Sequence, residues 1–165
     1  WTPEQFDRIT KTYRTWAKRA GDKGYKIGPE THWGAENYPD NMLKLAKAVD
    51  SPAYGILLHM GKDVAGTPDD YDCQLAPLAV HTHIDANTTF TRIDSALRIL
   101  RDAGYRGCLG VEHHSAKNEY AEVAAQLAFV RRAAAALDME EAAANPKGNP
   151  LLDPRNERAH QTKKM

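Results

Sequence analysis

The sequence predicts an α/β protein with a parallel β-sheet. Short apolar runs of strand length alternate along the chain with longer stretches in which apolar residues recur at helical spacing. The alternation repeats through about four units, and each apolar run ends at a polar residue. Alternating strands and helices fold as right-handed βαβ units, whose functional residues gather beyond the carboxyl ends of the parallel strands.

A helix is predicted at the start of the chain. Thr2 provides an N-cap hydroxyl, Pro3 stands at the first helical position and Gln5 is placed to close a capping box. Apolar residues then recur at helical spacing until Gly21 and Gly24 end the pattern. We therefore expect an amphipathic helix with one buried face.

The next segments form the first strand, a helix and the second strand. Residues 25–29 are a short extended run that ends at Glu30, and residues 41–49 return to helical apolar spacing. After a turn that contains proline, residues 53–58 are a continuous apolar run of strand length. This second predicted strand ends at His59.

The third strand follows a polar connection. Residues 61–71 contain glycine, proline and paired aspartates, so we expect a long loop with a short helical turn before Pro77. Residues 79–84 form the third predicted strand. Because side chains alternate along a strand, His81 and His83 point to the same face.

The fourth unit completes the pattern. A helix is expected over residues 93–103, closed by Gly104, and residues 108–111 form a fourth strand that ends at Glu112. An alanine-rich helix over residues 120–137 follows. Residues 1–144 are thus expected to be one structural unit. Residues 145–165 contain three prolines, many charges and few apolar residues, which predicts a mobile polar tail.

The composition argues against some classes of binding partner. Lysine plus arginine and aspartate plus glutamate number 22 each, so the chain has no overall field that attracts nucleic acid or acidic membranes. No apolar run reaches the roughly 20 residues of a membrane helix, and no signal segment opens the chain, which favours a cytoplasmic location. Cys73 and Cys108 are too few for a disulfide framework or a multi-cysteine zinc site.

The polar residues at the four strand ends are the candidate site. In a curved parallel sheet, Glu30, His59, His83 and Glu112 would converge on one mouth. Two carboxylates and two imidazoles are suitable ligands for manganese, zinc, cobalt or ferrous iron. Each of these residues alone is more often a capped surface or pocket residue than a ligand, so the convergence carries the hypothesis.

Three other histidines compete for these roles. The side chain of His81 is expected on the same face of the strand as His83. It either contacts and orients His83 or lies deeper in the barrel. His113 and His114 follow Glu112 directly and are expected to line the rim. Asp85 either orients His83 or caps the next helix.

Three segments resemble a known family. Residues 27–34 (IGPETHWG), 81–85 (HTHID) and 104–112 (GYRGCLGVE) resemble the last four βα units of sugar phosphate isomerase/epimerase proteins. The resemblance covers roughly residues 2–137. It implies the xylose-isomerase-like (β/α)8 TIM barrel fold, of which this chain would carry the C-terminal half.

The resemblance also implies a metal site. Such enzymes bind one divalent metal through a glutamate, an aspartate, a histidine and a glutamate after strands five to eight. Here these positions are Glu30, His59, His83 and Glu112, so His59 departs from the pattern. An imidazole in place of a carboxylate reduces the ligand charge and favours a softer ion. We therefore expect manganese or zinc, with cobalt, iron or magnesium as alternatives.

The expected activity is isomerisation or epimerisation of a sugar or sugar phosphate by proton transfer next to a carbonyl. Glu30 and Glu112 are the candidate catalytic pair, the alternative being that they only hold the metal. The candidate substrate-binding residues are His32, Trp33 and Lys62; Lys62 stands where the family often has another histidine, and Trp33 could instead be core packing.

Four βα units cannot close an eight-stranded barrel, so a partner is expected. We expect the sequence to be a truncated part of a longer protein that contains the N-terminal half barrel. The alternatives are a separate N-terminal partner chain and a second copy of this chain. Alternative functions are a noncatalytic half-barrel remnant or interaction subunit and a carbohydrate lyase of the same fold. A DNA-repair endonuclease would require more metal ligands and a basic groove, which this neutral chain does not indicate.

Overall fold

The computed structural model describes residues 1–114 and 117–144. The predicted tail, residues 145–165, lies outside the described residues. The elements follow one another as α1 (Pro3–Gly21), the 3-10 helix η1 (Gly34–Asn37), α2 (Pro39–Val49), β1 (Ile56–His59), α3 (Pro68–Leu75), the 3-10 helix η2 (Ala76–Leu78), β2 (Ala79–Ile84), α4 (Ala86–Asp102), β3 (Leu109–Val111) and α5 (Glu119–Ala144).

The sheet is parallel, as the alternation of strands and helices predicts. Its three strands lie in the order β1-β2-β3. His59 at the end of β1 pairs with His83 of β2, which in turn pairs with Gly110 of β3. The register therefore brings the carboxyl ends of all three strands to the same edge.

The prediction of a regular strand over residues 25–29 is wrong. This segment runs beside β1 but pairs with it only through two isolated parallel bridges, Ile27 with Tyr54 and Glu30 with Leu57. The backbone N–H of Ile27 donates to the carbonyl of Ala53, and that of Thr31 donates to the carbonyl of Leu57. The donor expected midway between them is Pro29, which has no N–H, so the ladder is interrupted there.

A close backbone approach accompanies this interruption. A Cβ added to Gly28 would lie 1.5 Å from the carbonyl oxygen of Gly55, so any larger residue would push the two segments apart. Glycine at this position lets residues 27–30 follow β1 closely. Glu30 consequently reaches the same edge as the strand ends.

Helix α3 provides the helical turn expected before Pro77, but it begins inside the loop predicted over residues 61–71. The helix begins at Pro68, where Thr67 and Asp70 form a capping box. The Thr67 hydroxyl accepts from the Asp70 N–H at 3.1 Å, and the Asp70 carboxylate accepts from the Thr67 N–H at 3.0 Å. The loop after β1 is therefore shorter than expected.

Helix α4 also begins earlier than the predicted residue 93. Asp85 caps it by accepting a 2.7 Å hydrogen bond from the N–H of Thr88. This outcome decides between the two roles considered for Asp85. The helix bends at Arg92, whose backbone angles of φ −151° and ψ 22° are not helical.

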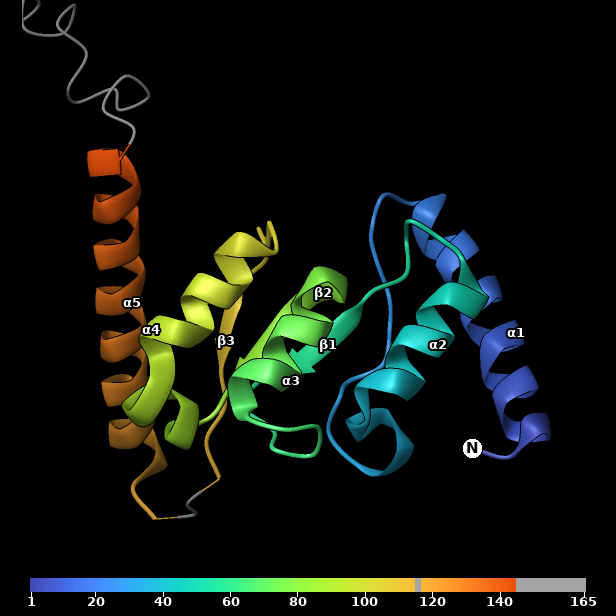
Figure 1. Ribbon diagram of the computed structural model, residues 1–165, viewed down its shortest axis with the longest axis horizontal. Coiled ribbons are helices and arrows are strands. Elements are labelled where there is room, and N and C mark those ends of the chain that lie inside the picture. Colours follow the sequence, from blue (N-terminus) through green and yellow to red (C-terminus); the bar gives the residue numbers. More distant parts are fainter. Residues whose placement is uncertain (115–116, 145–165) are drawn as a thin grey trace, which may run out of the picture.

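The helices follow the chain order across one side of the sheet (Figure 1). Each packs against its neighbour in sequence, from α1 with α2 to α4 with α5. Side chains that alternate toward these helices form the core, and Ile56, Leu58, Thr82 and Ile84 are all fully buried. His81 and His83 point to the opposite face of β2 and stay partly exposed.

Candidate metal centre

The four residues predicted as metal ligands lie together at the carboxyl edge of the sheet. His59 and His83 are at the ends of neighbouring strands, Glu112 directly follows β3, and Glu30 lies beside the end of β1. One ligand atom from each residue can be chosen so that all four atoms lie within 4.8 Å of one another. The convergence expected from the strand ends therefore occurs in the fold.

The distances within this cluster suit a small cation. Glu112 Oε2 lies 3.4 Å from Nδ1 of both His59 and His83. Glu30 Oε1 lies 2.9 Å from His83 Nδ1 and 3.6 Å from His59 Nδ1. Ligands about 2.1 Å from a tetrahedral ion are about 3.4 Å from each other, which is close to three of these four separations.

Two atoms of the cluster are buried without a partner. Within the described part of the chain, neither His59 Nδ1 nor Glu112 Oε2 forms a hydrogen bond. Buried polar atoms are nearly always bonded, and each unsatisfied one costs about 1–3 kcal/mol. A cation between these two atoms would satisfy both, so the residues present fit a divalent metal.

The charges of the cluster also suit cation binding. Burial by itself raises the pKa of Glu30, but the neighbouring imidazoles of His83, His32 and His59 lower it overall, which favours the carboxylate. Burial and the positive charge of Lys62 lower the pKa of His59, which favours the neutral imidazole. A carboxylate and a neutral imidazole are the forms that bind metals.

Backbone contacts hold the ligand-bearing segments in place. Thr31, which is fully buried, accepts the N–H of His59 on its hydroxyl at 2.9 Å and donates its own N–H to Leu57. The N–H of Met60 donates to the carbonyl of His83 at 3.0 Å. Sequence reasoning missed Thr31, although a β-branched hydroxyl between two polar site residues is a usable signal.

Each carboxylate has a further histidine two residues along the chain. His32 Nδ1 lies 3.3 Å from Glu30 Oε1, and His114 Nε2 lies 3.2 Å from Glu112 Oε1. The rings of His32 and His114 are 6.4 Å apart, so these residues border the cluster on its outer side. His114 thus lies at the rim, as expected.

The residues predicted to bind substrate lie beside the cluster. The ring of His32 lies 4.7 Å from that of His59 and 4.6 Å from that of Trp33. Trp33 is 75% exposed, so core packing is not its role. Lys62 is half-buried and close enough to His59 to influence its pKa.

His113 and His81 are not part of the four-residue cluster. The Nδ1 of His113 lies 2.9 Å from Oε1 of Gln126, and its Nε2 contacts Glu122, so this ring points toward α5 and not to the mouth. Gln126 is fully buried and also donates toward the carbonyl of Glu112. His81 shares the facing of His83, with ring centroids 5.8 Å apart.

Comparison with solved structures identifies the fold. A xylose isomerase domain protein from Planctomyces limnophilus superposes with a TM-score of 0.60 at 17% sequence identity, over 77% of this chain and 51% of that one. The fold is therefore xylose isomerase-like. The chain spans about half the length of that structure. No family model and no curated protein matches the sequence.

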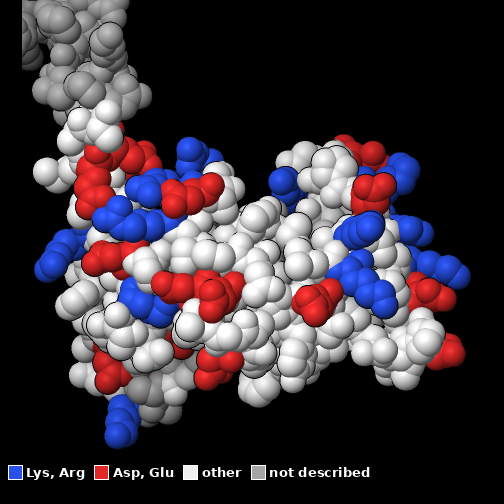
Figure 2. All heavy atoms as spheres, in the orientation of Figure 1, with Lys and Arg blue, Asp and Glu red and all other residues white. Residues whose placement is uncertain are grey.

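The surface carries charges of both signs. On the face shown in Figure 2, lysine and arginine are interspersed with aspartate and glutamate over the helices, and no extended region of one sign is visible. In the described ranges, none of the helices has the length and apolar character needed to cross a bilayer.

Proposed function

We propose that this chain is the C-terminal half of a (β/α)8 barrel and forms part of a divalent-metal-dependent sugar or sugar phosphate isomerase or epimerase. The observation that carries this proposal is the cluster of Glu30, His59, His83 and Glu112 at the carboxyl edge of a parallel sheet, with two of its buried atoms lacking a partner. The xylose isomerase-like fold supports the same class of reaction.

The four residues would hold one cation, with manganese or zinc favoured. Two carboxylates and two neutral imidazoles form a ligand set that these ions accept. When bound, the cation would polarise a carbonyl and an adjacent hydroxyl of an open-chain sugar, which acidifies the C–H bond next to the carbonyl.

The chain's own carboxylates are the proposed proton carriers. Glu30 and Glu112 reach the cluster from opposite edges of the three-stranded sheet, so each can face one side of a substrate carbon. The contact of His32 with Glu30 and that of His114 with Glu112 would keep each carboxylate oriented. His59 and His83 would act only as ligands.

Substrate contacts are assigned to the residues around the opening. The exposed indole of Trp33 offers an apolar face to a sugar ring or chain, and His32 offers a hydrogen-bonding nitrogen beside it. The Lys62 ammonium would bind a hydroxyl or an anionic group of the substrate.

A partner would complete the barrel. The segment 27–30 and strand β3 form the two edges of the sheet, and both present unpaired backbone groups. The part of this chain that superposes covers only 51% of the solved structure of similar fold. We propose that an N-terminal half barrel, or a second copy of the chain, pairs with these edges.

Elemental analysis of the purified chain tests the metal centre. We expect about one manganese, zinc, cobalt or iron per chain, and loss of the metal in the folded variants Glu30→Ala, His83→Ala and Glu112→Ala, because each removes a ligand. Asp94→Ala, an exposed change on α4, is the control and should retain the metal. A folded parent that stays metal-free after loading would contradict the proposal.

A second experiment separates the enzyme from a noncatalytic interaction subunit. With an N-terminal half barrel supplied, the metal-loaded complex should exchange the hydrogen next to a sugar carbonyl with deuterated water. A metal-loaded complex that catalyses no exchange on any sugar would favour the interaction subunit. Exchange accompanied by loss of water from the sugar would favour a carbohydrate lyase.

A further inference from the structure

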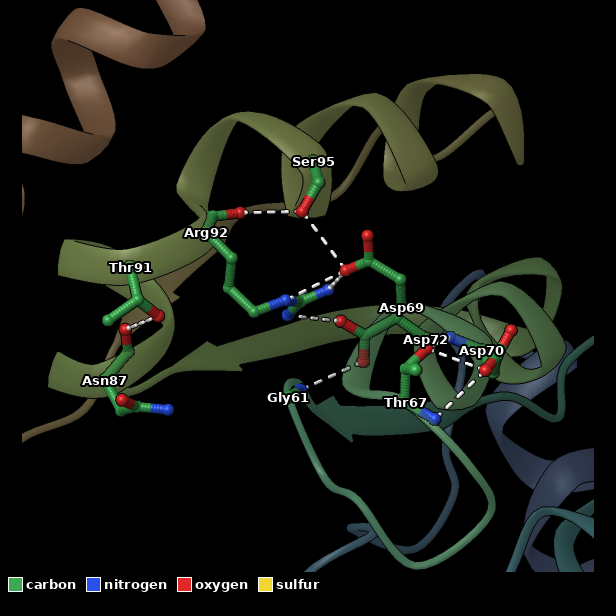
Figure 3. Close-up of polar contacts among 9 residues, drawn as sticks. All are labelled: Gly61, Thr67, Asp69, Asp70, Asp72, Asn87, Thr91, Arg92 and Ser95. Atoms are coloured by element: carbon green, nitrogen blue, oxygen red, sulfur yellow. Dashed lines mark hydrogen bonds and ion pairs between the residues drawn. The ribbon is translucent and has the colours of Figure 1, made fainter.

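A buried ion pair joins α3 and α4 (Figure 3). Asp72 on α3 has no exposed surface, and its Oδ2 accepts a 2.8 Å hydrogen bond from Arg92 on α4. Arg92 also pairs with Asp69, whose side chain is half exposed. Arg92 is the residue at which α4 leaves helical geometry, so the bend allows its side chain to reach α3.

The second oxygen of Asp72 contacts the chain that leaves β1. Oδ1 accepts the backbone N–H of Gly61 at 3.0 Å. Gly61 has a φ of +83°, and a Cβ at this position would lie 2.4 Å from the hydroxyl of Thr88, so the turn requires glycine. One carboxylate therefore fixes a turn that begins two residues after His59.

This turn is the third restraint on the His59 segment. Thr31 accepts the N–H of His59, and the N–H of Met60 donates to the carbonyl of His83. With Gly61 bound to Asp72, three consecutive backbone N–H groups are fixed by groups from three different segments. The imidazole of His59, which is only 6% exposed, has little freedom to move.

We propose that Asp72 is a positioning residue for the metal centre: it binds the Gly61 N–H while paired with Arg92, and so orients the imidazole of His59 and places Lys62 at the mouth. This inference rests on the proposed metal-binding function. Asp72 touches no ligand atom and acts only through the backbone of the turn. Loss of an outer contact of this kind typically lowers metal affinity by roughly 10- to 100-fold.

Burial opposes the contribution of this ion pair to stability. Burial raises the pKa of Asp72 in spite of the Gly61 N–H and the Arg92 charge, so the surroundings of this carboxylate do not favour its ionised form. Buried ion pairs frequently contribute little to stability compared with apolar residues of the same size. The contact with Gly61 gives the buried carboxylate a specific role.

Zinc affinity of the full chain, measured by titration calorimetry, tests the proposal through three variants. Asp72→Ala removes both contacts and should weaken zinc binding by roughly 10- to 100-fold. Asp72→Asn keeps an oxygen for the Gly61 N–H but loses the ion pair, so it should unfold at a lower temperature and bind zinc nearly as the parent does. Asp69→Ala removes only the contact between Arg92 and the half-exposed Asp69, so it should leave zinc affinity unchanged.

Amide hydrogen exchange of the metal-free chain provides a readout that needs no metal. Faster exchange at residues 59–62 is expected in Asp72→Ala and not in Asp72→Asn. Unchanged zinc affinity and unchanged exchange in Asp72→Ala would overturn the proposal, and so would equal losses in all three variants. If the parent binds no zinc, the proposed function fails, and the exchange pattern alone decides whether Asp72 holds the turn.

Discussion

The most informative single residue of the candidate site is His59, because it adds a second imidazole to the two carboxylates of the cluster. His59 approaches both Glu30 and Glu112, and burial favours its neutral form. The cluster therefore carries two negative charges when both glutamates are ionised. A neutral nitrogen ligand favours zinc over the harder ions manganese and magnesium.

We expect His59→Asp to change the metal preference. A third carboxylate favours manganese relative to zinc, and without metal it places like charges close together in a buried site. The ratio of zinc to manganese affinity should fall by tenfold or more, about 1.4 kcal/mol, and the metal-free variant should melt at a lower temperature. Calorimetric titration with each ion measures the ratio.

His81→Asp is the matched control for this change. His81 lies on the same face of β2 as His83 but outside the four-residue cluster. The control should leave the ratio of the two affinities unaltered. Equal changes in both variants would mean that general charge, and not ligand identity, determines the preference.

Residue patterns alone were sufficient to predict which four side chains converge, because parallel strands in register bring their carboxyl ends to one edge. They could not predict the supporting contacts. The roles of Thr31 and Asp72 depend on how the segment after Pro29 and helix α3 approach the end of β1, and these are tertiary distances. The pairing of His113 with Gln126 spans 13 residues and depends on the placement of α5.

At the scale of elements, the errors in the sequence prediction have local causes. The polar composition of residues 61–71 predicts a loop, but Thr67 and Asp70 form a capping box that starts α3 inside this stretch. The segment 25–29 has strand composition, yet Pro29 removes the donor that would continue its ladder. The cap at Asp85 extended α4 beyond its apolar pattern.

The cap of α3 gives a prediction about pH. Hydrogen bonds from the hydroxyl and the backbone N–H of Thr67 lower the pKa of Asp70 in the folded chain. Its stabilising contribution is therefore fully present above the ordinary aspartate pKa of about 3.9 and is lost as pH falls through the lower folded value. Asp70→Ala should lower the melting temperature at pH 7, and the difference from the parent should shrink toward pH 2.

Thermal melts of Asp70→Ala and of Asp94→Ala across this range measure the effect. Asp94 is exposed within α4 and does not occupy a capping position, so its substitution should produce a smaller difference at pH 7. A difference for Asp70→Ala that stays constant from pH 7 to pH 2 would show that the carboxylate charge does not support the start of α3.

At the scale of the whole molecule, the arrangement is a three-stranded parallel sheet with the helices packed along it. The helices lie in chain order on one side of the sheet, each against its neighbour (Figure 1). The inner face carries the partly exposed His81 and His83, and strand β3 contains no fully buried residue. Sequence periodicity predicts the number of units, but it does not predict what pairs with the outer edges of the sheet.

The proposed half barrel predicts association through the edge of β3. The backbone N–H groups of Gly110 and Glu112 point toward β2, so the N–H of Val111 between them points to the free edge.

If copies of the chain pair there, the melting temperature should rise with protein concentration, and sedimentation should show dimers or larger species. Val111→Pro removes the free donor while sparing the β2 ladder, and should abolish the concentration dependence. Leu43→Lys, on the outer side of α2, should not. A parent that sediments as a monomer at all concentrations would exclude self-pairing and leave a separate N-terminal half as the proposed partner.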